Sequence, residues 1–280
     1  MNMVLTRYKA NIGLEKKIRV ALVSDLHDRN PSETLRMLRR IRPDLILAAG
    51  DILERHEKGK SPWTVEKMDA WQGISRKNTW FTKLIKALDG SLPSAHKKRR
   101  AWDEKNGYVF LREASGIAPV VMGVGNHEWY YTGRDLAVLK RYGIRLLDNE
   151  DCELKVKGQS LRAGGLSTRY DLEWLDEFSR KPGKKILICH HPDYYFRYIR
   201  GESRDTFDLV VSGHTHGGQW RLFSAGGRRR GIPVFSPGQG VFPAHAYGRY
   251  GKLIVSSGVS NTTRIPRFGN PCEVVVIEMK

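Results

Sequence analysis

The sequence predicts an α/β fold with a mostly parallel sheet. Short apolar runs recur along the chain, and an amphipathic helix expected at residues 33–41 separates the first two of them. Strand, helix, strand is the order of a βαβ unit, which joins parallel strands. The runs with strand character lie at residues 20–23, 45–49, 120–124, 186–189 and 209–211.

The remaining elements are expected between and after these runs. Between the third and the fourth run, a helix is expected at residues 134–142, β-like runs at 152–156 and 161–164, and a helix at 172–178. Beyond residue 216 the chain becomes glycine-rich, which is typical of turns, and β-like runs recur at residues 252–256 and 273–278. We expect hairpins and an edge strand in this last part.

Length and composition fit one domain with an insertion. The chain has 280 residues, 40% of them hydrophobic, and can bury a substantial core. We expect a single domain over residues 1–280 with an inserted helical subdomain at residues 54–112, where the apolar periodicity gives way to charge. Helices inside the insertion are expected at residues 64–73, 79–88 and 95–114.

The insertion at residues 54–112 is basic and contains tryptophan. It holds fourteen Lys or Arg residues against seven Asp or Glu, and four of the seven tryptophans of the chain. Such a segment suits peripheral contact with an anionic membrane, where indole rings lie at headgroup depth. It also suits nucleic acid, which we rank lower, because bases stack on aromatic rings. In a purely structural alternative, the tryptophans pack the insertion onto the domain and the charges face water.

The net charge indicates the kind of partner but not its identity. At +18 and a pI of about 9.9, the protein raises the local concentration of phosphates, nucleic acid and anionic lipid. Three scattered cysteines, Cys152, Cys189 and Cys272, indicate neither a disulfide framework nor a thiolate zinc site.

The expected location is cytoplasmic, with peripheral contact at the inner membrane face as an option. No apolar run approaches the roughly 20 residues needed to cross a bilayer, so no transmembrane helix is expected. Residues 1–17 lack the uninterrupted apolar stretch of a signal peptide.

Polar blocks follow the apolar runs at the points where strands are expected to end. In α/β sheets, the loops at the carboxyl ends of the strands hold the chemistry. Each block alone is a common pattern, such as a turn or a helix cap, but their succession predicts one shared site. The blocks are Asp25-Leu26-His27, Gly50-Asp51, Gly125-Asn126-His127-Glu128, Cys189-His190-His191 and Gly213-His214-Thr215-His216.

The residue types indicate a site for two metal ions. Imidazole mixed with carboxylate suits Mn, Fe or Zn better than Mg or Ca, which prefer oxygen ligands. Two ions roughly 3.5–4 Å apart can hold a nucleophilic water and a phosphoryl oxygen together. Such a pair needs one bridging carboxylate, and Asp51 is the natural bridge, because it stands alone after an apolar run and a glycine.

These blocks resemble the signature of the calcineurin-like metallophosphoesterases, in which DxH, GD, GNH(D/E), H and GHxH occur in this order. The resemblance spans residues 18–216 and implies a four-layer αββα sandwich with two divalent metal ions. Matching positions imply a first metal held by Asp25, His27, Asp51 and His216. They imply a second metal held by Asp51, Asn126, His190 and His214.

The resemblance also implies roles beyond the ligands. With Asp51 as the bridge, His127 would be catalytic, lying next to the substrate phosphate and assisting departure of the leaving oxygen. Glu128 would orient His127 or a ligand by a hydrogen bond. His191 and Arg55 are candidate substrate-binding residues. The arginine partly matches the GDxxDR motif of related protein phosphatases, but Glu replaces Asp and the following glycine is absent.

The last third of the chain resembles one branch within this family. The sequences HTHGGQ at residues 214–219 and IPRFGNPCEV at 265–274 resemble the bacterial YkuE-like branch, whose relatives include UDP-2,3-diacylglucosamine pyrophosphatases of lipid A synthesis. This implies hydrolysis of a phosphodiester or pyrophosphate bond in a lipid-linked or nucleotide-sugar substrate. The connection between the GD and GNH blocks is longer than is usual in the branch, so the substrate is not carried over with the motifs.

Other functions use the same residues. A nuclease, a cyclic-nucleotide phosphodiesterase or a phosphomonoesterase would need the same metal centre, with a phosphorylated small molecule, a lipid or a nucleic acid as substrate. A nucleic-acid- or membrane-binding scaffold is the alternative outside enzymes. The complete set of seven ligands argues against a scaffold, because a silent protein has no physical reason to keep them.

Overall fold

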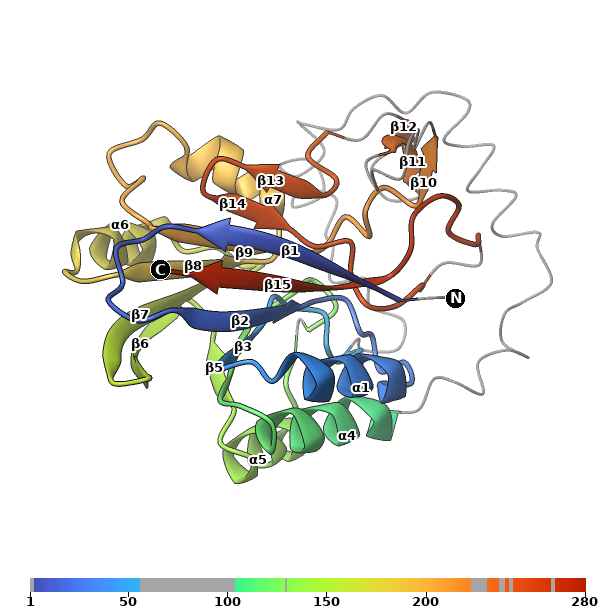
Figure 1. Cartoon of the computed structure of the whole chain (residues 1–280), viewed down its shortest axis with the longest axis horizontal. Coiled ribbons are helices and arrows are strands. Elements are labelled where there is room, and N and C mark those ends of the chain that lie inside the picture. Colours follow the sequence, from blue (N-terminus) through green and yellow to red (C-terminus); the bar gives the residue numbers. More distant parts are fainter. Residues whose placement is uncertain are drawn as a thin grey trace.

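Two six-stranded sheets pack face to face, and helices cover the outer face of each (Figure 1). This arrangement is seen in a computed structural model, which describes residues 3–55, 104–128, 130–222, 231–236, 240–241, 244–262 and 265–280. None of the helices in these ranges is long and apolar enough to cross a membrane.

The first sheet is parallel except at one pair of strands. Its order is β1-β15-β2-β3-β4-β5, and only β15 and β2 run antiparallel. The strands are β1 (Val4–Ala10), β15 (Glu273–Met279), β2 (Ile18–Val23), β3 (Leu45–Ala48), β4 (Val120–Gly123) and β5 (Arg145–Leu147).

The second sheet has a parallel centre with an antiparallel pair at each edge. Its order is β13-β14-β9-β8-β7-β6. The strands are β13 (Gly248–Tyr250), β14 (Leu253–Val255), β9 (Leu209–Ser212), β8 (Lys185–Cys189), β7 (Gln159–Leu166) and β6 (Glu150–Val156). A small antiparallel sheet is formed by β10 (Trp220–Leu222), β11 (Ile232–Ser236) and β12 (Gly240–Val241).

Helices form the two outer layers (Figure 1). Those on the first sheet are α1 (Ser32–Ile41), α4 (Glu104–Ser115) and α5 (Gly133–Arg141). Those on the second sheet are α6 (Leu172–Arg180), α7 (Pro192–Tyr194) and the π-helical turn η2 (Tyr195–Ile199).

The central strands are mostly apolar because both faces of each sheet are covered, and polar residues such as Arg19 and Lys185 lie near the strand starts. In β2, Val20 and Leu22 face the second sheet, whereas Ala21 and Val23 face the helices. The interior therefore divides into a layer between the sheets and one under each set of helices. The predicted four-layer αββα sandwich is confirmed.

The structure contains every strand predicted in the described ranges, and also elements that were not predicted. The hairpins expected beyond residue 216 are present as β10, β11 and β12 and as β13 and β14, and β13 is an edge strand of the second sheet. β15 is interior, since β1 pairs with it. Strands β1 and β5 and the helical turns α7 and η2 were not predicted, and the residue bounds of β10, β11 and β12 were not given in advance.

Only the two ends of the basic insertion, residues 54–55 and 104–112, are described. The helices expected at residues 64–73 and 79–88 lie outside the described residues, as does the first part of the one expected at 95–114. The rest of that helix is α4, whose Phe110 and Leu111 are fully buried against the first sheet with α1.

Candidate metal centre

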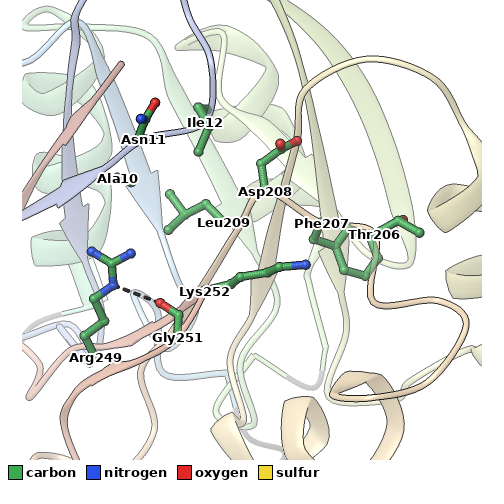
Figure 2. Close-up of a pocket in the computed structure, with 10 residues that line it drawn as sticks. All are labelled: Ala10, Asn11, Ile12, Thr206, Phe207, Asp208, Leu209, Arg249, Gly251 and Lys252. Atoms are coloured by element: carbon green, nitrogen blue, oxygen red, sulfur yellow. Dashed lines mark hydrogen bonds between the residues drawn. The ribbon is translucent and has the colours of Figure 1, made fainter.

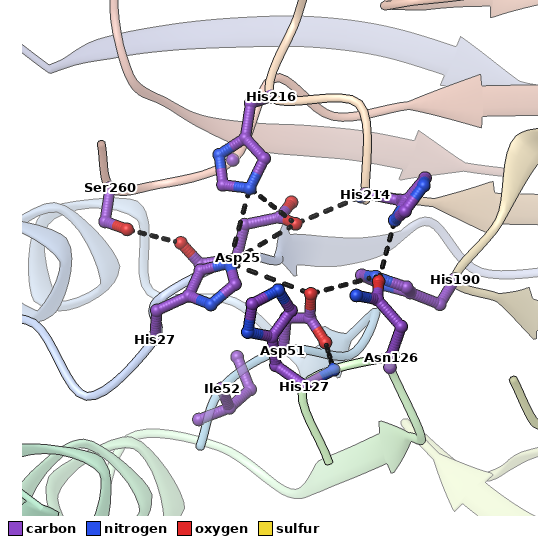
Figure 3. Close-up of polar contacts among 12 residues, drawn as sticks. Asp25, His27, Asp51, Ile52, Asn126, His127, His190, His214, His216 and Ser260 are labelled. Carbon is purple, nitrogen blue, oxygen red and sulfur yellow. Dashed lines mark hydrogen bonds and ion pairs between the residues drawn. The ribbon is translucent and has the colours of Figure 1, made fainter. Parts of the chain in front are cut away.

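The seven predicted ligands lie together at one end of the sandwich (Figure 3). They follow the carboxyl ends of β2, β3 and β4 in the first sheet and of β8 and β9 in the second. Groups of side chains able to hold a metal ion occur three times among the described residues, and all three groups lie in this cluster. The groups are Asp25 with His27 and His216, His27 with Asp51 and His127, and Asp25 with Asp51 and His190.

The loops that carry the ligands have an unusual backbone. Five of the seven predicted ligands have a positive φ, between 47° and 72°: Asp25, His27, Asp51, His214 and His216. This left-handed region costs a non-glycine residue about 1–3 kcal/mol and persists where the surrounding structure enforces it. The space is also tight, because a Cβ on Gly125 would lie 2.1 Å from Oδ1 of Asp51.

Four side chains form the first group. Nε2 of His216 lies 3.3 Å from Nε2 of His27 and 3.6 Å from Oδ1 of Asp25. Nε2 of His27 lies 3.7 Å from Oδ2 of Asp51 and 4.0 Å from Oδ1 of Asp25. Atoms bound to one ion at about 2.0–2.2 Å lie roughly 3–4 Å apart, so the atoms of Asp25, His27 and His216 fit a single ion, and Asp51 adjoins this set through His27.

The second group shares Asp51 with the first. Oδ2 of Asp51 lies 3.1 Å from Nε2 of His190. Oδ1 of Asn126 lies 3.1 Å from the same nitrogen and 2.8 Å from Nδ1 of His214. Each group joins residues of the first sheet (Asp25, His27, Asp51, Asn126) to residues of the second (His190, His214, His216) (Figure 3).

The charges of the cluster suit cations. Asp25 and Asp51 are buried, and buried charges need a partner or a metal. Burial raises the pKa of Asp25. Burial alone would also raise the pKa of Asp51, but the imidazoles of His190 and His127 outweigh it and hold this pKa well below its usual value. Oδ2 of Asp25 is buried and makes no hydrogen bond in the described part of the chain.

His127 lies beside the first group and faces solvent in part. Its ring packs edge-on against that of His27 with 4.4 Å between centroids, and its backbone N–H donates to Oδ1 of Asp51 at 2.7 Å. Its side chain is 32% exposed, whereas that of His27 is fully buried. Burial disfavours the imidazolium, yet Asp51 and Glu54 raise the pKa of His127 to about 9.

Glu54 is a site residue that the sequence reasoning missed. Its carboxylate joins two histidines, with Oε1 2.7 Å from Nδ1 of His27 and Oε2 3.1 Å from Nδ1 of His127. A carboxylate behind a histidine fixes the ring and raises its basicity. The available signal was its place in the GDxxER sequence, directly before Arg55.

Glu128 holds the backbone of the ligand loops rather than the ring of His127. Oε1 accepts the N–H groups of Ile52 and Leu53 at 2.8 and 2.9 Å, and Oε2 accepts those of Asp51 and Gly125 at 3.0 Å each. The carboxylate is fully buried, and burial raises the pKa of Glu128 to about 7. It connects the loop after β3 to the loop after β4.

The two predicted substrate-binding residues have protein partners. The guanidinium of Arg55 pairs with Asp28 at 2.7 Å and with Asp135 at 2.8 Å. The ring of His191 is buried beside that of His214, with 4.2 Å between centroids, and its Nε2 lies 3.1 Å from Oγ1 of Thr168. Their roles toward substrate remain a prediction.

Arg267 is a second residue that the sequence reasoning missed. Its Nη2 lies 3.1 Å from Nδ1 of His216, and its side chain is buried. It is 51 residues away from His216 in the chain, and the IPRFGNPCEV sequence that contains it was noted without assigning Arg267 a role at the site.

A separate pocket lies away from this cluster (Figure 2). Its lining includes Ala10 at the end of β1 and Leu209 at the start of β9, whereas the predicted ligands follow the end of β9. Asp208 is the single acid among the lining residues, so the pocket does not form a second metal site.

The comparisons with known proteins agree with this geometry. A model of the family described as calcineurin-like phosphoesterase matches residues 18–218, a range that contains all seven predicted ligands. The match covers more than half of the chain. The chain therefore belongs to the calcineurin-like phosphoesterase family, a class of metal-dependent phosphoester hydrolases.

Several curated relatives share part of their length with this chain. YpbG of Bacillus subtilis is 26% identical over 58% of this chain and 58% of its own length. An uncharacterized metallophosphoesterase of Aquifex aeolicus is 33% identical over 56% of this chain and 59% of its own. Cj0846 of Campylobacter jejuni, also described as an uncharacterized metallophosphoesterase, is 28% identical over 64% of this chain and 46% of its own. The chain thus spans about half to three fifths of these relatives.

The similar solved structures are distant. A 5'-nucleotidase precursor from Thermus thermophilus superposes with a TM-score of 0.43 at 13% identity, covering 75% of this chain and 43% of that one. The phosphopantetheinyl hydrolase PptH from Mycobacterium tuberculosis gives 0.33 at 13% identity, covering 70% and 82%.

Replacing Glu128 by Gln should unfold the ligand loops. The amide nitrogen of Gln would face two backbone N–H donors that now bond to a carboxylate oxygen, and each unsatisfied buried donor costs about 1–3 kcal/mol. We expect the free energy of unfolding to fall by at least about 2 kcal/mol in urea titrations. Glu150→Gln, at an exposed position, is the control and should change it little. Equal stability of the two variants would contradict the role of Glu128.

Proposed function

We propose that the protein is a dinuclear-metal phosphoesterase that hydrolyses a phosphodiester or pyrophosphate bond. The observation that supports this most directly is the position of Asp51, whose Oδ2 lies within 3.7 Å of His27 and within 3.1 Å of His190. One carboxylate atom between two sets of donors is the arrangement that a bridged pair of ions needs. The mixture of imidazole and carboxylate favours Mn, Fe or Zn.

In this proposal the chain divides the catalytic work among named groups. When bound, the two ions would activate water and polarise the phosphoryl oxygen. Asp25, His27, Asp51 and His216 would hold the first ion, and Asp51, Asn126, His190 and His214 the second. His127, the partly exposed imidazole beside them, would give a proton to the leaving oxygen, with its ring held by Glu54.

Replacing Asp51 by Asn should abolish hydrolysis. An amide carries no charge and cannot hold two cations with one oxygen atom, so the rate should fall at least about 10²–10³-fold. The measurement is turnover of bis-p-nitrophenyl phosphate with Mn²⁺ added. Asp205→Asn is the matched control, since Asp205 pairs with Lys252 away from the cluster. Equal rates for the wild type and the Asp51 variant, with both folded, would exclude the bridging role.

Replacing His127 by Gln should slow poor substrates more than good ones. A general acid contributes about 10²–10⁴-fold, and its contribution grows as the leaving oxygen becomes more basic. We expect a larger loss of kcat with a phenyl ester than with the p-nitrophenyl ester, measured at saturating metal. The good leaving group serves as the internal control. A loss independent of the leaving group would assign His127 to binding rather than to proton transfer.

We extend the proposal to lipid-linked or nucleotide-sugar substrates, as the resemblance to the YkuE-like branch implies. Exposed apolar side chains on and beside the small β10–β11–β12 sheet support a lipid: Leu222 is 37%, Ile232 55% and Phe268 61% exposed. Leu222 and Ile232 are cross-strand partners, and Phe268 adjoins Arg267, which contacts His216. The positive net charge would attract the phosphates of such a substrate.

The basic character of the chain also leads to a proposal about its location and its partners. We propose a cytoplasmic protein that makes peripheral contact with an anionic membrane through residues 54–112, which are basic and contain four tryptophans. A nuclease, a cyclic-nucleotide phosphodiesterase and a phosphomonoesterase are the other outcomes of the substrate test below.

A panel of substrates separates these functions. UDP-2,3-diacylglucosamine, cyclic nucleotides, oligonucleotides and phosphomonoesters would be compared by kcat/KM, and we expect the highest value for the lipid. Changing Leu222, Ile232 and Phe268 together to Ser should raise KM for the lipid about tenfold, since each loses apolar contact. The KM for bis-p-nitrophenyl phosphate is the control and should not change. A preference for oligonucleotides would replace the lipid by nucleic acid.

A further inference from the structure

The two histidines of the first group have opposite partners behind them. His27 and His216 both direct Nε2 toward the first metal position, and these nitrogens lie 3.3 Å apart. Behind the ring of His27, Nδ1 faces the carboxylate of Glu54 at 2.7 Å. Behind the ring of His216, Nδ1 faces the guanidinium of Arg267 at 3.1 Å. One ligand of the same site is thus supported by an anion and the other by a cation.

A guanidinium is an unusual partner for a metal-binding histidine. Such a histidine normally donates its second N–H to a carboxylate or a carbonyl, which leaves the other nitrogen bare for the metal. Arginine has five donors and no acceptor. Facing Arg267, Nδ1 of His216 therefore accepts a hydrogen bond, and the proton of the neutral ring is on Nε2. Turning the ring over would remove Nε2 from the cluster, so rotation does not resolve the conflict.

Arg267 is fixed in this place, and the carboxylates of Asp25 and Glu273 act on its charge only from beyond ion-pair distance. It donates to the backbone carbonyls of Ser257, at 2.7 Å, and of Ser260. Its side chain is buried, and within the described residues no carboxylate lies at ion-pair distance from it. A buried charge without an ion-pair partner is costly. Its field also opposes a cation at the site behind which it lies.

We infer that Arg267 is a positioning residue that weakens metal binding at the first site, through His216, and makes that ion the exchangeable one of the pair. Glu54 acts in the opposite direction on the same site through His27. The inference rests on the proposed function, because it assigns the first site to a metal. It adds that the enzyme holds one ion firmly and takes up the other according to the supply of metal.

Metal affinity measures this directly, without activity. Metal-free protein would be titrated with Mn²⁺ by calorimetry, with bound metal counted after dialysis. Changes behind a ligand histidine alter affinity about 10- to 100-fold. We expect Arg267→Gln, whose amide oxygen can accept a hydrogen bond from Nδ1–H of His216, to tighten the weaker of two sites by at least about tenfold. Arg267→Lys keeps the charge and the donors and should stay close to the wild type. Glu54→Gln should weaken the same site.

The outcomes are distinct. Unchanged or weaker binding by a folded Arg267→Gln protein, or tightening by Arg267→Lys of the same size, would overturn the inference. If Arg267→Gln does not fold, ¹⁵N spectra of histidine-labelled, metal-free wild type test the same point. A bare Nδ1 and a protonated Nε2 at His216, assigned with His216→Asn, support the inference, and the reverse tautomer refutes it. Failure of the proposed function appears separately, as wild-type protein that binds no metal.

Discussion

The structure of the site depends on a buried carboxylate that is not itself a predicted ligand. Glu128 accepts four backbone N–H groups, three from the loop after β3 and one from the loop after β4. These loops carry Asp51 and Asn126. Left-handed backbone at Asp51 is unfavourable in isolation and persists only where neighbouring bonds enforce it. Glu128 supplies that constraint, and the position of the shared carboxylate follows from it.

Charge is arranged in shells around the predicted metals. Asp25 and Asp51 lie innermost with the imidazoles, and neither carboxylate has a lysine or arginine within ion-pair distance in the described ranges. Arg55 is held outside by Asp28 and Asp135. This order leaves the inner anions available to cations, because a neighbouring lysine or arginine would compete for them. Arg267 is the exception, and it reaches the site through a histidine rather than through an acid.

Much of the fold could be predicted because its strands are buried on both faces. Apolar runs as short as residues 20–23 and 45–49 indicate buried strands, and the polar blocks that follow them show where these strands end. β1 could not be predicted in the same way, because an edge strand with Arg7 and Lys9 pointing to solvent does not read as apolar. β10 and β11 are short and partly exposed, so their sequences resemble loops.

The part of the site that could be predicted is the set of residues that belong to sequence motifs. Asp25, Asp51 and His216 belong to blocks that stand out in the sequence, and the structure brings them together. Glu54 and Arg267 act behind ligands and belong to none of the ligand blocks, so they were not assigned to the site, although Glu54 lies in the GDxxER sequence and Arg267 in IPRFGNPCEV. The hydrogen-bond partners of Glu128 could not be predicted either. They are backbone N–H groups, which nearly every residue type carries, so the sequence does not distinguish them.

The predicted ligands come from both sheets, and this has a consequence for the whole molecule. Each ion would bind residues from both halves of the sandwich and so act as a cross-link at one end of it. Its binding free energy would then add to the resistance of the chain to unfolding. In a cell short of metal, both the amount of the protein and its rate of hydrolysis would fall. The amount would fall because a chain that unfolds more often is degraded more often.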